Sequence, residues 1–199
     1  MNATRPIVGV LLAAGVGRRY DPSGERLKLL EGAQGISATG MPIAAAALRN
    51  LRAAIADVIA VVRPADSAAQ QQLHRLLAAE GAHLVVCPDA ADGMGHSLAC
   101  GVGARSNAAG WVIALADMPA VSPSTIAAVR DAIAGGQPAA APVHRGRRGH
   151  PVGFGRACLT ELLGLTGDAG ARSVLAAHPP LLIDVDDPGC LLDIDTPAA

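Results

Sequence analysis

Short apolar segments alternate with amphipathic segments along most of the chain. Continuous apolar runs that end at glycine, proline or polar residues are typical of the buried strands of a parallel sheet. Such runs occur at 7–13, 57–62, 83–86, 111–116, 139–143, 151–154 and 181–185. Segments with helical spacing lie between them, at 42–51, 67–79, 96–105, 123–134, 156–163 and 171–177. This alternation predicts an α/β protein with a mostly parallel, mixed sheet and helices on both faces, a three-layer α/β/α Rossmann-like arrangement.

The predicted topology also says where a ligand would bind. In open α/β sheets, ligands bind beyond the carboxyl ends of the strands. Glycines and polar residues interrupt the apolar pattern at three such ends, from Ala14, from Asp89 and from Asp117 onward. We therefore expect the chemistry of this protein at these three places.

Composition describes the core. Apolar residues make up 51% of the 199 positions, but the only aromatic residues are Tyr20, Trp111 and Phe154. The core must then be packed with alanine, valine, leucine and isoleucine, which suits helices laid over a buried sheet. A chain of this length buries enough surface to fold as a single domain over 1–199.

Charge and cysteine usage exclude several classes of partner. A net charge of −1 provides no basic field for nucleic acid. The apolar run near the N-terminus is too short to span a bilayer, and it lacks a clear cleavage site, so no membrane partner is expected. The four cysteines have no C-x-x-C spacing, which argues against a disulfide framework and against structural zinc. These features predict a soluble, cytoplasmic protein with buried thiols.

A glycine-rich stretch follows the first predicted strand. Gly15 and Gly17 are followed by Arg18 and Arg19, and then by Lys28, the only lysine of the chain. Glycines let backbone N–H groups turn toward phosphate, and the cationic side chains neutralise its charge. The stretch has no Gly-Lys-Ser/Thr ending, and Tyr20 stands where a dinucleotide fingerprint needs a third glycine. Taken alone, the G-x-G could equally be a structural strand-to-helix turn.

Longer patterns carry a resemblance to a known family. The segments are LLAAGVGRRY…LKLL at 11–30, DGMGHSLACG at 92–101, ALADMP at 114–119, GHPVGF at 149–154, GDAGARSVL at 167–175 and DIDTP at 193–197. In this order they resemble the MobA-like nucleotidyltransferases, and most closely the molybdenum cofactor cytidylyltransferases. The resemblance implies a nucleotidyltransferase fold and Mg²⁺-dependent transfer of CMP from CTP to the phosphate of a molybdopterin-type acceptor. It further implies a molybdoenzyme or its maturation chaperone as a protein partner.

Carboxylates at two chain positions fit a metal role. Asp117 directly follows a predicted strand, where Mg²⁺ can be held by one or two carboxylates together with water and substrate phosphates. A turn cap ahead of Pro119 is the alternative for this aspartate. Asp193 and Asp195 point to the same side of an extended segment. The family pattern favours Asp195 as the second metal ligand, and capping of a last turn that starts at Pro197 is the alternative for this residue. The acidic residues at 184, 186 and 187 are interpreted as a solvated strand end.

The resemblance distributes roles over the remaining motifs. It implies catalytic roles for Lys28, Arg19 and Asp117. Nucleotide-binding roles are implied for Leu12, Ala13, Ala14, Gly15, Gly17, Arg19, Lys28, Asp89, Gly93, Met94, Gly95 and Ser97. Acceptor-binding roles are implied for His150, Asp168, Gly170 and Arg172.

Two segments keep alternative interpretations. The loop at 93–97 enters a predicted helix, whose N-terminus offers free N–H groups to an anion or a base edge. Within it, His96 is more readily explained as a surface or capping residue than as a general base. The arginines of HRGRRGH at 144–150 would attract a substrate phosphate, or they would form a solvated hairpin tip.

The choice of substrates rests on fewer residues. Ala14, in L-A-A-G, resembles the cytidylyl branch, because the guanylyl branch usually has L-A-G-G. The eight residues between Arg19 and Lys28 exceed the usual family spacing, which affects nucleotide fit. The alternatives are transfer to a sugar or alditol phosphate, use of GTP, and a non-catalytic cofactor-binding chaperone with the same fold.

Overall fold

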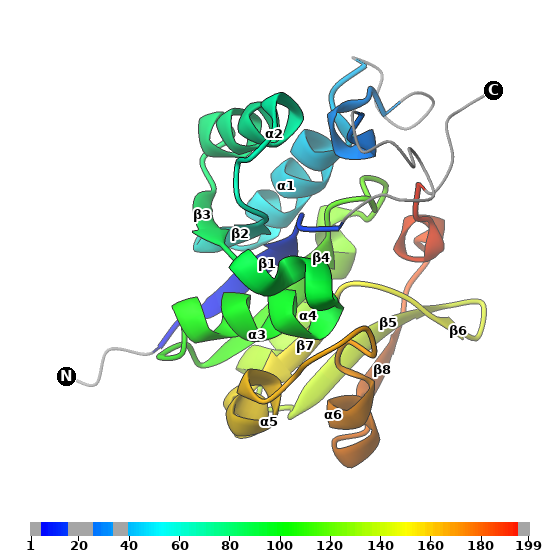
Figure 1. The fold of residues 1–199 in the computed structure, drawn as a ribbon. Helices are drawn as coiled ribbons and strands as arrows, with labels where there is room; N and C mark the ends of the chain where they lie inside the picture. Colours follow the sequence, from blue (N-terminus) through cyan, green and yellow to red (C-terminus); the bar gives the residue numbers. More distant parts are fainter. Residues whose placement is uncertain (1–4, 16–25, 34–39, 195–199) are drawn as a thin grey trace.

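The computed structural model describes residues 5–15, 26–33 and 40–194, which form an eight-stranded sheet flanked by helices (Figure 1). The strand order is β3-β2-β1-β4-β7-β5-β6, and β8 pairs with β5. The strands are β1 (Ile7–Leu12), β2 (Val58–Val62), β3 (His83–Val86), β4 (Gly110–Leu115), β5 (Ala139–His144), β6 (Arg147–Arg148), β7 (Val152–Gly155) and β8 (Leu181–Asp184). The predicted α/β class with a mixed sheet is confirmed.

Parallel pairing brings four strand ends to one edge of the sheet. β1 lies parallel to β2 and β4, and β2 lies parallel to β3. Leu12 is in register with both Val61 and Leu115, so β1 and β4 end at the same level. β7 runs antiparallel to β4 and β5, while β8 is parallel to β5. The loops after β1, β2, β3 and β4 therefore share the carboxyl edge.

Two apolar cores lie on opposite faces of the sheet, because successive strand residues point to opposite sides. On one face Leu11 and Val112 pack with α1 (Ile43–Ala54), α2 (Ala68–Ala79) and α4 (Pro123–Ala134). On the other face Trp111 and Phe154 pack with α3 (Met94–Ala104), α5 (Leu159–Leu163) and α6 (Arg172–Ala177). The three-layer arrangement agrees with the expectation from sequence.

Local signals explain where two of the helices begin. Ser122 precedes α4, and its hydroxyl accepts a hydrogen bond from the Thr125 N–H at 3.2 Å. Ser67 caps α2 in the same way through the Gln70 N–H. Each cap satisfies one of the N–H groups that a helix leaves without an internal partner.

Three segments differ from the sequence-based expectation. The predicted helix at 156–163 is a 3₁₀ turn, Arg156–Cys158, followed by the short α5. Helix α3 begins at Met94, two residues earlier than predicted, and β6 falls in a stretch expected to be a loop. β6 escaped notice because both of its residues are exposed arginines and carry no apolar pattern. No helix in the described part of the chain is long and apolar enough to cross a membrane.

Candidate active site

The backbone after β1 passes from the core to the surface at the carboxyl edge. Ala13 and Ala14 are buried, and the Ala13 N–H donates to the Val61 carbonyl at 2.9 Å. Gly15 is exposed, and a Cβ placed on it would meet no atom of the described residues within 4 Å. Crowding by the described part of the chain therefore does not explain this glycine, which leaves close approach of a ligand to the backbone as a reason for it.

Lys28 and Asp117 meet at this edge. Lys28 begins the 3₁₀ turn Lys28–Leu30, which buried Leu27 and Leu29 anchor to the core. Its Nζ donates to Oδ2 of Asp117 at 2.9 Å, and the two side chains are only 13% and 26% exposed. Partial shielding from water strengthens this attraction relative to a surface pair. The structure thus brings the predicted phosphate-binding cation and the predicted metal carboxylate to one point.

The position of Asp117 is set by the end of β4. Pairing with β1 continues to the Ala116 N–H, which donates to the Leu12 carbonyl at 3.1 Å. The chain then turns, with the Met118 N–H donating to the Leu115 carbonyl at 3.2 Å. Asp117 is therefore the first residue beyond the strand ladder, where its side chain can reach a ligand at the sheet edge.

Asn50 on α1 holds the loop that carries Asp117. Its Nδ2 donates to the carbonyls of Pro119 and Val121, each at 3.0 Å. Sequence reasoning missed this residue, although its signal was present, since it is a polar side chain beside the apolar face of the helix. A cavity of about 10 Å³, with room for one water molecule, lies between Asn50, Met118 and His150.

The C-terminal segment reaches the same loop. The Ile194 N–H donates to the Asp117 carbonyl at 3.0 Å, and Asp193 beside it is exposed. The predicted residues Gly17, Arg19 and Asp195 lie outside the described residues. The DIDTP segment therefore begins in contact with the residue with which it is predicted to share a metal.

The described residues can supply only some of the ligands that a hard divalent cation needs. Asp117 offers carboxylate oxygens at a partly exposed position. Within 5–15, 26–33 and 40–194, no group of three or more His, Cys, Asp or Glu side chains could hold a metal ion. Mg²⁺ suits such a site, because it takes one or two carboxylates and completes its shell with water and substrate phosphates. The described residues thus fit shared coordination of Mg²⁺ and provide no all-protein cage.

His150 lies on the Asp117 side of the site. Burial lowers the pKa of its imidazole, the carboxylates of Asp117 and Asp193 oppose that shift, and the charge of Arg148 adds to it. The Nδ1 atom is buried and has no hydrogen-bond partner among the described groups. The backbone N–H donates to the Cys190 carbonyl at 2.9 Å. The residue predicted to touch the acceptor is therefore within electrostatic reach of the predicted metal carboxylate.

The predicted nucleotide loop packs directly against the predicted acceptor loop. The Gly95 N–H donates to the Gly167 carbonyl at 2.8 Å, and the Gly167 N–H donates to Nδ1 of His96 at 3.3 Å. Gly93 has φ 132°, and a Cβ there would fall 2.2 Å from the Gly167 carbonyl carbon. The expectation of a free N–H is therefore wrong for Gly95, because a neighbouring loop already accepts from it. His96 is half-buried, and its Nδ1 joins the two loops by accepting from the Gly167 N–H.

The remaining predicted residues surround this joint. Gly170 is buried, with φ 56°, and a Cβ on it would lie 3.2 Å from the Met94 sulfur. Ser97 is buried in α3, whereas Asp89 is exposed in the turn after β3. Asp168 and Arg172 are exposed, and Arg172 begins α6. The structure thus groups 93–97 with 167–172, and it groups Lys28 with Asp117 and His150.

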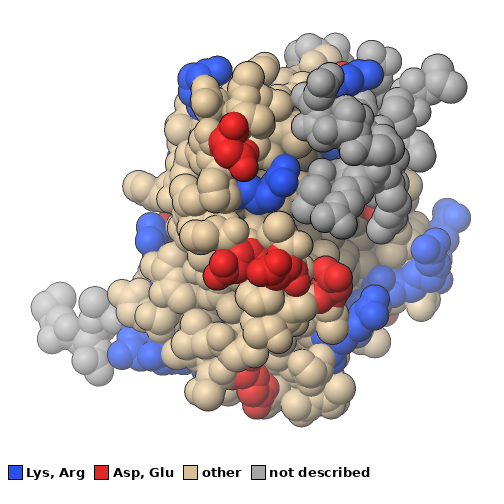
Figure 2. Space-filling view, viewed as in Figure 1, with Lys and Arg blue, Asp and Glu red and all other residues tan. Residues whose placement is uncertain are grey.

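Charged side chains of both signs lie on the face seen in Figure 2. Acidic side chains gather near its centre, and basic side chains project at the side where β6 lies in Figure 1. Arg145, Arg147 and Arg148 are exposed around this hairpin. These arginines are solvated at the hairpin tip, and attraction of a substrate phosphate stays a prediction.

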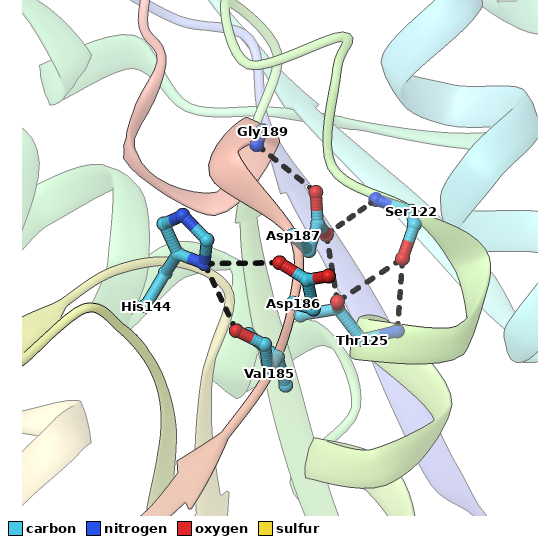
Figure 3. A network of polar contacts seen from close by, with 7 residues as sticks. All are labelled: Ser122, Thr125, His144, Val185, Asp186, Asp187 and Gly189. Atoms are coloured by element: carbon cyan, nitrogen blue, oxygen red, sulfur yellow. Dashed lines mark hydrogen bonds and ion pairs between the residues drawn. The ribbon is translucent and has the colours of Figure 1, made fainter.

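One acidic residue contradicts the interpretation of 184–187 as a solvated strand end. Asp184 and Asp186 are exposed, but Asp187 is only 8% exposed. Figure 3 shows its carboxylate accepting hydrogen bonds from Ser122, Thr125 and Gly189. That interpretation is wrong for Asp187, because tertiary contacts supply hydrogen-bond donors that offset the free-energy cost of burying its charge.

A Rossmann-like sheet with a lysine, a carboxylate and an open glycine at its carboxyl edge is an arrangement suited to phosphate chemistry. The MobA-like NTP transferase domain model matches residues 9–181 of the chain. The purine catabolism protein PucB of Bacillus subtilis (strain 168) is 30% identical over 200 residues, which cover 96% of this chain and 92% of PucB. The chain therefore belongs to the MobA-like NTP transferase family, and it is a nucleotidyltransferase.

Solved structures agree with this assignment. The crystal structure of Rv0371c from Mycobacterium tuberculosis H37Rv has a TM-score of 0.80 and 29% identity, covering 98% of this chain and 95% of that one. A structure of Rv0371c in complex with manganese has a TM-score of 0.67 and 24% identity, covering 96% and 91%. The resemblance found in the sequence motifs is confirmed at the level of the family.

Proposed function

We propose that this nucleotidyltransferase moves CMP from CTP to the phosphate of a molybdopterin-type acceptor and releases pyrophosphate. The observation that carries the proposal is the 2.9 Å contact of Lys28 with Asp117 at the sheet edge where β1 also ends and leads to exposed Gly15. A cation, a carboxylate and an uncrowded glycine at one sheet edge are the groups that a nucleoside triphosphate and its metal require.

The reaction needs no covalent enzyme intermediate. An oxygen of the acceptor phosphate attacks the α-phosphorus of CTP, and the bond from that phosphorus to the bridging oxygen of pyrophosphate breaks. Lys28 and Arg19 neutralise charge on the triphosphate, and the glycine stretch binds it through backbone N–H groups. Asp117 and Asp195 would hold Mg²⁺. When bound, Mg²⁺ stabilises negative charge on the phosphate oxygens.

The contact between the 93–97 and 167–170 loops supports adjacent substrates. Gly95 and His96 are hydrogen-bonded to Gly167, so a nucleotide at the first loop and an acceptor at the second would lie side by side. Alignment of two bound reactants is itself a large part of catalysis in phosphoryl chemistry. His150, within electrostatic reach of Asp117, would contact the acceptor where it approaches the metal side.

The choice of CTP rests on the Ala14 version of the glycine stretch. GTP, or a sugar or alditol phosphate acceptor, would use the same groups at the sheet edge. The relative PucB is named for purine catabolism, and that name supports neither GTP nor a sugar or alditol phosphate as substrate. We therefore retain CTP and the pterin phosphate as the proposal, with the other substrates as outcomes of its test.

The test measures pyrophosphate release with CTP, GTP and ATP in Mg²⁺, each with molybdopterin and with a panel of sugar and alditol phosphates. Asp117→Asn and Lys28→Ala should lower kcat/KM by about 100-fold or more, since both groups act on transition-state charge. Asp57→Asn is the matched control, because Asp57 pairs with Arg105 at 3.4 Å just before β2, at the opposite edge of the sheet.

Each outcome has a defined meaning. The proposal would be supported if pyrophosphate were released only from CTP and only with molybdopterin as acceptor. This activity should be lost in Asp117→Asn and Lys28→Ala and kept in Asp57→Asn. Preference for GTP or for a sugar phosphate would overturn the base or the acceptor. Nucleotide binding without pyrophosphate release from any pair would favour a cofactor-binding chaperone.

A further inference from the structure

The side chain of Asp187 fastens the C-terminal part of the chain to helix α4. Its Oδ2 accepts from the Ser122 N–H at 2.9 Å and from the Thr125 hydroxyl at 2.6 Å. Its Oδ1 accepts from the Gly189 N–H at 2.9 Å, in the first turn of the 3₁₀ segment Pro188–Leu191 (Figure 3). The carboxylate also faces the N-terminus of α4, where the helix dipole favours a negative charge.

The turn fastened in this way is wedged between two loops of the site. A Cβ on Gly189 would fall 2.0 Å from the Ala120 carbonyl oxygen, in the loop after β4. A Cβ on Gly149 would fall 2.3 Å from the Cys190 carbonyl oxygen, which itself accepts from the His150 N–H at 2.9 Å. Neither glycine has room for a side chain, so the turn packs backbone against backbone on the segments that carry Asp117 and His150.

The chain beyond this turn contacts Asp117, the predicted metal ligand. Beyond the turn, the Ile194 N–H donates to the carbonyl of Asp117 at 3.0 Å. Asp187 is therefore connected to Asp117 along two routes, through Gly189 to Ala120 and through residues 188–194. Asp186, one residue away, has a fully exposed side chain whose Oδ1 lies 4.0 Å from the His144 ring, and it takes no part in these routes.

We propose that Asp187 is a positioning residue, which seats the segment 188–194 against the loop after β4 and so sets the geometry of the Asp117 metal site. The inference rests on the proposed function, because it assigns Asp117 and Asp195 to the metal. Asp187 is assigned no contact with substrate or metal. It acts by fixing how Ile194, whose N–H donates to the Asp117 carbonyl, lies against Asp117.

The variant Asp187→Asn weakens the hydrogen bonds that hold the Pro188–Leu191 turn and changes the shape of the side chain little. An amide has only one acceptor oxygen, so either orientation turns its NH₂ group toward a backbone N–H, of Ser122 or of Gly189. Asp186→Asn is the same substitution one residue earlier and serves as the control. Thr125→Val removes only the hydroxyl bond to Asp187 and keeps the side-chain shape, so it provides a milder second variant if Asp187→Asn does not fold.

Two kinds of measurement separate positioning from simple structural damage. Amide hydrogen exchange at residues 188–194 reports whether the segment is released. Mn²⁺ titrated in the presence of CTP, with free Mn²⁺ followed by electron paramagnetic resonance and pyrophosphate release assayed alongside, reports the metal site. We expect Asp187→Asn to speed exchange of the Ile194 amide about tenfold. We expect it to weaken Mn²⁺ binding about 10-fold or more, as outer-shell changes do at other metal sites. The KM for CTP should change less than about twofold, while kcat falls.

Asp186→Asn should leave all of these quantities unchanged, and Thr125→Val should shift them in the same direction by a smaller factor. Faster exchange with unchanged Mn²⁺ binding would overturn the proposal, as would unchanged exchange. A wild type that releases no pyrophosphate would instead refute the proposed function. The Mn²⁺ binding of Asp187→Asn would still decide whether Asp187 positions a metal site.

Discussion

Lys28 and Asp117 are 89 residues apart in sequence, and their charged atoms lie 2.9 Å apart at the carboxyl edge of the sheet. The lysine comes from a short turn attached to the start of α1, and the aspartate comes from the end of β4. This contact is the point at which the predicted phosphate-binding and metal-binding groups become one site.

The same contact should be measurable as an interaction energy. We expect a double-mutant cycle with Lys28→Met and Asp117→Asn, analysed by urea unfolding, to give a coupling of about 1 kcal/mol, because both side chains are partly shielded from water. The exposed pair Arg26 and Glu31, at 2.8 Å with side chains 64% and 38% exposed, is the control and should couple by less than about 0.5 kcal/mol. Equal coupling in the two pairs would contradict the prediction.

Two glycines of helix α3 should respond oppositely to alanine. A Cβ on Gly95 would lie 2.6 Å from the Thr166 carbonyl oxygen, so Gly95→Ala must push apart the two substrate loops and should lower the free energy of unfolding by about 2 kcal/mol or more. A Cβ on Gly103 would make an ordinary 3.5 Å contact with Leu163. Gly103→Ala should therefore raise stability by up to about 1 kcal/mol through helix propensity. Thermal unfolding of the two variants checks the opposite signs, and a shared sign would refute this explanation.

The four free thiols should differ in reactivity. Burial raises the pKa of Cys87 to about 11 and that of Cys158 to about 11, and it raises the pKa of the Cys190 thiol as well. Only about one thiol in a thousand is ionised three pH units below its pKa, and the thiolate is the nucleophile. Cys100 is partly exposed. Iodoacetamide at pH 8 should therefore label Cys100 first, as read by peptide mass spectrometry. Preferential labelling of Cys87 or Cys158 in the folded protein would be the contrary result.

An ion pair between α1 and the end of α2 should make the free energy of unfolding depend on pH in the acid range. Two hydrogen bonds of 2.7 Å from Arg49 lower the pKa of the Glu80 carboxyl below its ordinary value of 4.5. The unfolded chain then binds a proton before the folded one, so the contribution is complete above about pH 4.5 and is lost as pH falls through the lowered folded pKa.

The variant Glu80→Gln isolates this contribution. The difference in unfolding free energy between wild type and Glu80→Gln should be largest near neutral pH and should shrink steadily below about pH 4.5. Urea unfolding at a series of pH values from neutral to acid measures it. A difference that does not vary over this range would show that the carboxyl of Glu80 titrates alike in the folded and unfolded chain.

Local patterns predicted the frame of the site well. The apolar runs located the strand ends, and the glycine and aspartate that follow such ends, Gly15 and Asp117, indicated the edge that is proposed to be functional. These signals are local, because strand length, burial and the residue that follows a strand are all written within a few positions. The motifs between 11 and 197 added the family, which the comparisons confirmed.

Side-chain partnerships could not be predicted in the same way. Three of these contacts join segments that are far apart in sequence: the hydrogen bonds of Asn50, of His96 with Gly167, and of Asp187. In the sequence alone, the acidic residues at 184–187 look like any solvated strand end. Burial of Asp187 is possible only because Ser122, Thr125 and Gly189 present donors from two separate elements. The sequence by itself therefore determined the α/β frame, the family and the sheet edge proposed for the chemistry, because periodicity and strand-end residues are local properties. Only the tertiary structure decided which polar groups meet there, because a hydrogen bond or ion pair depends on the distance between atoms that folding alone brings together.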